Sequence, residues 1–185
     1  MAGPRALLVL AAAVAAASCS LLAAPAAADV AALASVCQMT KFPELCTTTA
    51  GLQAGKYPTV DVLTVLRMQV DALDKQTAAA RARVAELAKT ATPAGRAALE
   101  LCGKFYFDVE DNLGACRRAI GFKDAETIRA TMLMAVQDMQ NCDQEFRNIN
   151  EPNPMQGDDA SLSNLVENCR YLSNHVKSEV PQTDS

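Results

Sequence analysis

The chain has 185 residues, with 17 Lys and Arg against 21 Asp and Glu, a net charge of −4 and a pI near 5.0. This length suits a single domain. The acidic balance argues against a nucleic-acid-binding protein, which normally shows a basic surplus on one face. His175 is the only histidine, which excludes a metal site built from several histidines.

The first 28 residues have the pattern of a secretory signal peptide. Arg5 supplies a positive start, a largely apolar run follows, and the alanines at 26–28 are the small residues that signal peptidase requires. We therefore expect residues 1–28 to be removed and the mature chain to begin at Asp29, with no membrane anchor. Loss of Arg5 leaves 16 basic residues against 21 acidic ones, so the net charge changes from −4 to −5.

Four long segments place apolar residues at alternating steps of three and four. They run from Leu63 to Leu87, from Leu99 to Ile120, from Ile128 to Ile149 and from Leu162 to Val176. Each pattern predicts an amphipathic helix with one buried face. Short links favour antiparallel neighbours, so residues 58–180 are predicted to form an up-down-up-down four-helix bundle in an all-α protein.

The links between these helices have recognisable signals. Thr92, followed by proline, is a suitable N-cap for the second helix, and residues 121–124 make a tight link to the third. Two prolines in residues 151–157 forbid helix continuation there. The fourth helix is then expected to begin at Asp158 or Asp159, where negative charge favours a helix start.

A smaller unit, residues 29–57, precedes the bundle. Apolar residues predict two short helices, and residues 41–43 turn the chain between them. Such short helices are marginal in water by themselves. A disulfide between Cys37 and Cys46 would hold this N-terminal helical hairpin together.

The mature chain keeps six of the seven cysteines, an even number that invites disulfides in an oxidising compartment. They are Cys37, Cys46, Cys102, Cys116, Cys142 and Cys169. A zinc site is a poor alternative because there is no CxxC pair and no Cys/His cluster. We expect neither a metal nor a cofactor.

Three cysteine-containing segments carry a resemblance to a known family. Residues 36–46 read Val-Cys-Gln-Met-Thr-Lys-Phe-Pro-Glu-Leu-Cys, residues 101–106 read Leu-Cys-Gly-Lys-Phe-Tyr, and residues 132–146 continue the third helix through Cys142. Eight residues separate the first two cysteines and 39 separate Cys102 from Cys142. With this joint signature the chain resembles the plant invertase and pectin methylesterase inhibitor family over essentially all of its mature length.

The resemblance implies a single secreted inhibitor domain over residues 29–180, with disulfides Cys37–Cys46 and Cys102–Cys142. Members of the family have no catalytic activity. They bind cell-wall enzymes of the apoplast, one to one, and block them. An enzyme is also disfavoured by the residues themselves, because His175 has no accompanying nucleophile motif such as G-x-S-x-G.

Two target enzymes remain open. Invertase inhibitors often carry Pro-Lys-Phe near the start of the third helix, and the corresponding residues 122–127 lack it. We therefore favour pectin methylesterase as the target, with acid invertase as the alternative. A helical interaction module without an inhibited enzyme is a second alternative.

Charged residues around the second link are candidates for partner binding. They are Arg117, Arg118, Lys123, Asp124 and Glu126. They are interpreted either as a polar contact patch for an enzyme cleft or as ordinary solubilising charge. In an enzyme complex such charges would chiefly set specificity and encounter rate.

The helix register gives a further prediction for the cysteines. Cys102 lies near the start of the second helix and Cys142 near the end of the third, so antiparallel packing brings them level. Counting about 1.5 Å per residue puts Cys116 and Cys169 about 15 Å apart along the bundle, beyond disulfide reach. We therefore expect both to be buried free thiols. Closing the Cys102–Cys142 loop should stabilise the fold by about 4 kcal/mol.

Overall fold

The computed structural model describes residues 27–177, and its regular structure is entirely helical. The elements are α1 (Ala27–Cys37), α2 (Pro43–Gly51), a short 3-10 turn η1 (Ala54–Lys56), α3 (Val62–Leu87), α4 (Pro93–Gly121), α5 (Ala125–Asn148) and α6 (Gln156–Ser173). Since residues 27–177 contain no strand, the predicted all-α class is confirmed. The expected signal peptide lies mostly outside the described residues.

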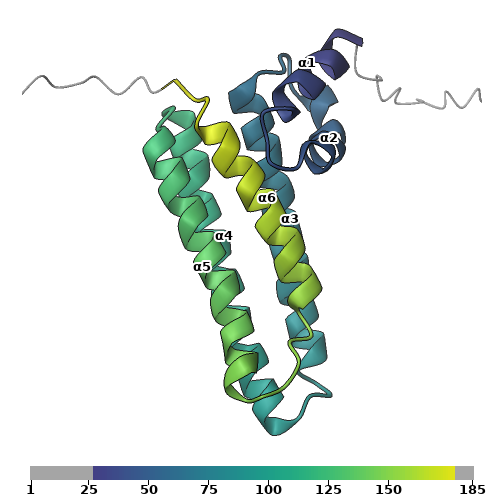
Figure 1. Ribbon diagram of the computed structural model, residues 1–185, viewed down its shortest axis with the longest axis vertical. Coiled ribbons are helices and arrows are strands. Elements are labelled where there is room, and N and C mark those ends of the chain that lie inside the picture. Colours follow the sequence, from purple (N-terminus) through teal and green to yellow (C-terminus); the bar gives the residue numbers. More distant parts are fainter. Residues whose placement is uncertain (1–26, 178–185) are drawn as a thin grey trace, which may run out of the picture.

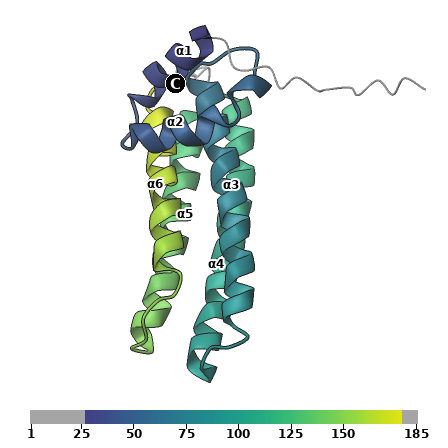
Figure 2. The ribbon, with the colours of Figure 1, turned by 90° about the vertical axis from the view of Figure 1, so that its right-hand side faces the viewer.

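The four long helices α3–α6 alternate in direction and form an elongated bundle (Figure 1). α4 packs against α3 and α5, and α6 packs against α5 and α3. The helices therefore follow chain order around one core, and the predicted up-down-up-down bundle is confirmed. Figure 2 shows α1 and α2 together at one end of the bundle.

Side-chain caps explain where the bundle helices begin. Asp61 accepts a hydrogen bond from the Thr64 amide at 2.8 Å, Thr92 from the Gly95 amide at 2.9 Å, and Asp124 from the Thr127 amide at 3.0 Å. Each bond satisfies an amide that the first helical turn leaves without a partner. The cap at Thr92 is the one that the sequence predicts.

The start of α6 differs slightly from the prediction. The helix begins at Gln156, two or three residues before the expected start, so Asp158 and Asp159 lie within its first turn instead of beginning it. Their negative charge still lies at the positive end of the helix dipole. Met155 is fully buried beside this start and covers the end of the core.

The apolar stripes of the four helices meet in one core. Their large fully buried side chains include Leu66, Leu73, Leu99, Leu113, Ile128, Met132, Leu162 and Leu165. Burying side chains of this size contributes about 1.5–3 kcal/mol each, before the entropy of ordering them is subtracted. This common core, more than helix propensity, holds helices of 18–29 residues in place.

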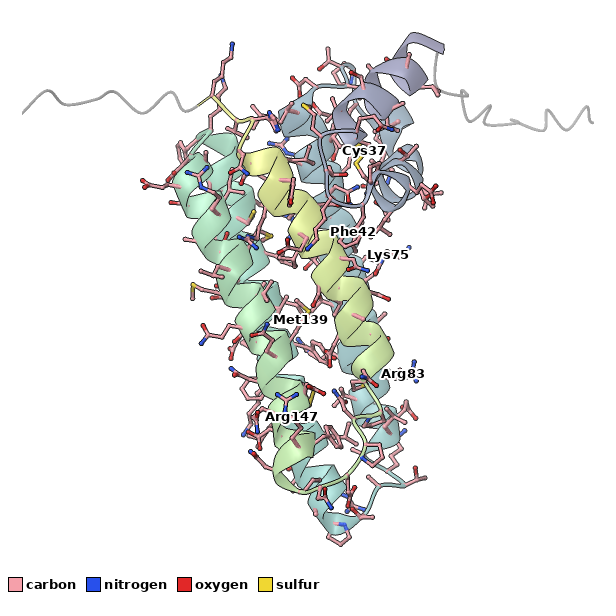
Figure 3. The ribbon with its side chains drawn as sticks, viewed as in Figure 1. Cys37, Phe42, Lys75, Arg83, Met139 and Arg147 are labelled. Atoms are coloured by element: carbon pink, nitrogen blue, oxygen red, sulfur yellow. A yellow bond between two sulfur atoms is a disulfide. The ribbon has the colours of Figure 1, made fainter. Side chains whose placement is uncertain are left out.

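The N-terminal hairpin packs on α3 and α6. Cys37 and Cys46 form a disulfide with Cα atoms 5.5 Å apart, and Figure 3 shows Cys37 and Phe42 at this end of the molecule. The fully buried Asn168 of α6 holds the turn by two hydrogen bonds: its Oδ1 accepts from the Phe42 amide at 2.9 Å, and its Nδ2 donates to the Phe42 carbonyl at 3.1 Å. A single side chain thus satisfies both backbone groups of the turn residue.

A second disulfide joins Cys102 of α4 to Cys142 of α5, with Cα atoms 4.7 Å apart. These are the two pairings that the family resemblance implies. Cys116 and Cys169 are buried free thiols. The reason for their separation, however, is different from the one that the helix count gives.

The expected 15 Å axial offset between Cys116 and Cys169 is wrong. The Tyr106 hydroxyl of α4 donates a 2.6 Å hydrogen bond to Asp159 of α6, so these two residues are level. α4 and α6 run in the same direction, and each cysteine lies ten residues further along its helix, which brings the thiols level too. Electrostatic interaction with Cys116 accordingly helps to raise the pKa of Cys169, although burial is the larger cause.

The axial offset is wrong because the connection between α5 and α6 follows a different path from the one that the count assumes. Counting residues assumes that this link lies across the end of the bundle, so that α6 starts beside the last turn of α5. Instead the link climbs along the bundle axis (Figure 1), and Asn153 within it donates to both Asp143 of α5 and Asp159 of α6. Asp159 therefore lies about 15 Å, or nearly three helical turns, further up the bundle than the count implies.

Diagonal placement, not axial offset, separates the two thiols. α4 and α6 occupy opposite corners of the bundle, with α3 and α5 between them. Neighbouring helix axes are roughly 8–10 Å apart, so diagonal axes are about 11–14 Å apart. A disulfide requires Cα atoms within about 7 Å.

We expect peptide mapping without reduction to recover linked peptides for Cys37–Cys46 and for Cys102–Cys142. Cys116 and Cys169 should react with an alkylating reagent only after denaturation, because both are buried. The control is the same digest after reduction, in which all six peptides should be alkylated. Recovery of a Cys116–Cys169 peptide from native protein would show that α4 and α6 approach more closely than diagonal helices do.

Candidate functional site

The turn between α4 and α5 is the first candidate surface. Arg118 and Glu126 are exposed on its two sides, and Lys123 lies half-buried between them. Lys123 has a left-handed backbone with φ of 53°, which closes the turn in few residues. The turn thus brings together three of the five charged residues that the sequence singles out.

The other two residues of this set have structural contacts. Arg117 bridges α4 to α3, donating to Asp71 at 3.0 Å and to Asp74 at 2.9 Å, and both bonds raise its pKa against the effect of burial. Asp124 caps α5 and accepts from the Thr127 hydroxyl and amide, which lowers its pKa. Both are explained by the fold, so neither needs a partner.

Phe122 is the residue at this turn that the charge pattern missed. Its side chain is 78% exposed, between the end of α4 and the cap of α5. A large aromatic side chain held on a short, capped turn can enter a partner's pocket at small entropic cost. The sequence did contain a signal: Phe122 is apolar but falls after Ile120, where the buried stripe of α4 ends.

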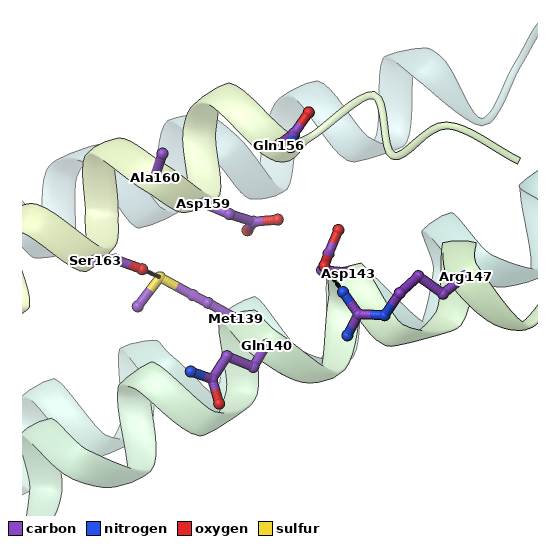
Figure 4. A pocket seen from close by; sticks show the side chains of 8 residues that line it. All are labelled: Met139, Gln140, Asp143, Arg147, Gln156, Asp159, Ala160 and Ser163. Atoms are coloured by element: carbon purple, nitrogen blue, oxygen red, sulfur yellow. Dashed lines mark hydrogen bonds and ion pairs between the residues drawn. The ribbon is translucent and has the colours of Figure 1, made fainter.

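A groove between α5 and α6 is the second candidate surface (Figure 4). Its apolar lining residues are the buried Met139 and the exposed Ala160, and Ser163 lies beside the Met139 sulfur. Polar side chains line the rest: Gln140, Asp143, Arg147, Gln156 and Asp159. Asp143 forms an ion pair with Arg147 on the same helix.

Asp159 is the most buried charged residue of this groove, with 9% of its surface exposed. The pKa of Asp159 is raised, chiefly by burial and further by the nearby carboxylates Asp143 and Asp158. Hydrogen bonds from Tyr106 and Asn153 act in the opposite direction and lower it. Burial and the carboxylate partner also raise the pKa of Tyr106, which keeps its proton. The pair is therefore a tyrosine donor and a carboxylate acceptor that orders the start of α6.

Reactive groups are few in the described part of the chain. His175 is exposed just beyond the end of α6. No group of three or more His, Cys, Asp or Glu that could hold a metal ion occurs within residues 27–177. Over the same residues, no helix is long and apolar enough to cross a membrane. The exposed turn and the polar groove are surfaces suited to binding a macromolecule.

A family model described as "Plant invertase/pectin methylesterase inhibitor" matches residues 31–172, which includes every helix of the bundle and the hairpin. The chain belongs to this family. No curated protein matches it significantly in sequence. Membership in an inhibitor family agrees with the absence of a nucleophile motif from the sequence.

Two solved structures show the same fold as this inhibitor family member. One is a mutant form of a pectin methylesterase inhibitor from Arabidopsis, with a TM-score of 0.64 and 13% identity, covering 79% of this chain and 97% of that one. The other is a pectin methylesterase inhibitor from Arabidopsis thaliana, with a TM-score of 0.59 and 13% identity, covering 80% and 97%. At this identity the likeness establishes the fold alone.

We expect Asp159 to make the inhibitor fold more stable as the pH falls. Because the pKa of Asp159 is raised above its ordinary value of 3.8, its contribution to stability is fully present below that value and is lost as the pH rises through the folded-state pKa. Asp159→Asn should therefore flatten the rise in unfolding free energy between about pH 7 and about pH 4, measured by urea denaturation.

Tyr106→Phe is the matched comparison, since it removes only the hydroxyl that donates to Asp159. Loss of this bond should raise the pKa of Asp159 further and steepen the same pH dependence. If both variants keep the wild-type pH profile, the buried carboxylate is not the group responsible.

Proposed function

We propose that this chain is a secreted inhibitor that binds pectin methylesterase, one to one, and occludes the cleft in which its polymeric substrate lies. It would act outside the cell, in the apoplast, where it would modulate pectin methylesterification in the wall. The family match over residues 31–172 is the observation that carries the proposal. The two similar structures, both pectin methylesterase inhibitors, share its fold.

The occlusion mechanism rests on a rigid helical surface. α4 and α5 are joined by a disulfide and by packing along their length, and α5 alone is about 36 Å long. Because this surface is already ordered, little conformational entropy is lost when it binds an enzyme. More of the free energy of the contacts then remains as binding affinity. A cleft for a polymer is itself long, and a rod of this length can cover it.

The α4–α5 turn also bears on the choice of target. It reads Gly121-Phe-Lys-Asp124 and lacks the Pro-Lys-Phe order that the family resemblance associates with invertase inhibition. This departure favours pectin methylesterase. Acid invertase remains the alternative, because this turn carries the Lys and Phe of the invertase-inhibitor motif in the reversed order, Phe122 before Lys123. The Phe122 side chain is exposed there.

We expect the purified protein to inhibit pectin methylesterase and to leave acid invertase largely active. The measurement is a parallel titration of one enzyme of each kind, with residual activity recorded against inhibitor concentration at the same pH. Strong inhibition of invertase with unaffected esterase would reverse the target. Inhibition of neither enzyme, with recovery of an unrelated receptor from wall extracts, would favour the non-inhibitory interaction module.

We expect Phe122→Ala to weaken inhibition about tenfold or more, because truncating a buried aromatic anchor in an interface costs about 1.4 kcal/mol or more. Phe107→Ala is the matched control: Phe107 is also exposed, at 57%, but stacks against Arg81 on the α3–α4 side. Equal inhibition constants for wild type and Phe122→Ala would remove the turn from the contact surface.

A further inference from the structure

A pocket of about 420 Å³ lies between the end of the N-terminal hairpin and α3. We call it the hairpin pocket. Its volume falls within the roughly 300–1,000 Å³ that is usual for small-molecule sites. Figure 3 shows Lys75, one of its lining residues, on α3 below the hairpin. The other polar lining residues are Thr49, Gln53, Lys56, Asp71 and Gln76.

The apolar part of the lining comes from both sides of the pocket. Leu52, just after α2, is 83% exposed, more than any other large apolar side chain in the described part of the chain. Ala72 and Ala79 of α3 line the pocket as well. Small side chains on α3 leave room beside Leu52, and a ligand with an apolar body would remove this surface from water.

The positive charges of the pocket have no partner in the fold. Lys56 and Lys75 are both exposed, and neither side chain forms an ion pair or hydrogen bond within residues 27–177. Arg81 and Arg83, further along α3, each form an ion pair with a carboxylate. The half-buried Gln76 also makes no side-chain hydrogen bond among the described residues, so its amide is a third available donor.

The acidic residue at the pocket already has partners. Asp71 accepts a hydrogen bond from the Arg117 guanidinium at 3.0 Å and one from the Tyr57 hydroxyl at 3.4 Å. Its charge is therefore offset on the side away from the lysines. Two ammonium groups beside an apolar wall remain, and such a wall concentrates their field in the pocket. The pocket thus favours an anion, although the whole chain is acidic.

The hairpin side of the pocket is held in place by hydrogen bonds from buried and half-buried amides. Gln53 donates to the Met68 carbonyl of α3 at 2.9 Å. The buried Gln69 of α3 donates to the Thr49 hydroxyl at 2.6 Å and to the Cys46 carbonyl at 3.1 Å. Because the hairpin disulfide restrains the same segment, little ordering is needed when a ligand binds.

We propose that the hairpin pocket binds a small apolar carboxylic acid. Its carboxylate accepts hydrogen bonds from Lys56 and Lys75, and its apolar body covers Leu52 and the alanines of α3. The groove between α5 and α6 lacks these properties, because Arg147 is already paired with Asp143 there. This inference goes beyond the proposed inhibition and does not depend on the target enzyme.

Binding of cinnamate to the purified chain, measured by equilibrium dialysis, is the first test. We expect one site with a dissociation constant of about 0.1–1 mM, as for a small ligand in an open pocket. Cinnamyl alcohol has the same apolar body without the charge and should bind at least about fivefold more weakly. Raising the ionic strength from about 0.05 M to about 0.5 M should weaken binding of cinnamate only.

Variants of the lysines test the anion contact. Lys56→Gln combined with Lys75→Gln should weaken cinnamate binding about tenfold and leave binding of the alcohol unchanged. Lys104→Gln is the matched control, since Lys104 is an exposed lysine of α4 outside the pocket. Leu52→Ser should weaken binding of both compounds, because it removes apolar contact and no charge.

Acetylation of lysines locates the site directly. Cinnamate should slow the reaction of Lys56 and Lys75 with acetic anhydride and leave that of Lys104 unchanged. Octanoate carries the same carboxylate on a flexible chain, so its affinity relative to cinnamate distinguishes a lipid-like ligand from a compact one. No saturation below about 10 mM by either acid, equal affinity for acid and alcohol, or equal protection of Lys104 would overturn the proposal. Enzyme inhibition is measured without these compounds, so this failure would leave the proposed function standing.

Discussion

The hydrogen bond from Tyr106 to Asp159 sets the position of α6, and several other features depend on where α6 lies. Both residues are buried, and a carboxylate is buried only at a cost unless donors satisfy it. Tyr106 and Asn153 supply those donors, and together they fix the first turn of α6 against α4 and α5. Nine residues further along, Asn168 consequently meets Phe42 and anchors the hairpin. One polar contact at the lower half of the bundle thus determines how the N-terminal unit docks at the other end.

Much of the fold could be predicted from the sequence because it depends on local signals. The 3–4 stripes located all four bundle helices, and Thr92 marked the start of α4. The register of α6 could not be predicted in the same way. Its start depends on whether residues 149–155 run across the bundle or along it, and a link of this length and composition permits both. Only the tertiary partners of Asn153 and Asp159 decide between them.

The candidate surface was predicted less well than the fold, for a related reason. A charged residue near a link appears exposed in sequence, but Arg117 is drawn to Asp71 and Asp74 on a helix more than forty residues away. Asp124 looked like a contact residue and is a cap. Phe122 was passed over because apolar residues are expected inside, although it follows the last residue of the buried stripe of α4, and it lies outside. Charge pattern alone does not distinguish residues that hold the fold from residues left for a partner.

The hairpin has a consequence for how the bundle closes. Three of the four helix pairs around the core are consecutive in the chain, so their contacts close short loops. The α3–α6 pair is the exception, because it joins the first bundle helix to the last. Contacts between distant segments carry the largest loop-closure cost and form late in folding. α2 packs on both α3 and α6, across this seam. The small disulfide-bonded unit therefore bridges the helix pair whose contacts close the longest loop of the bundle.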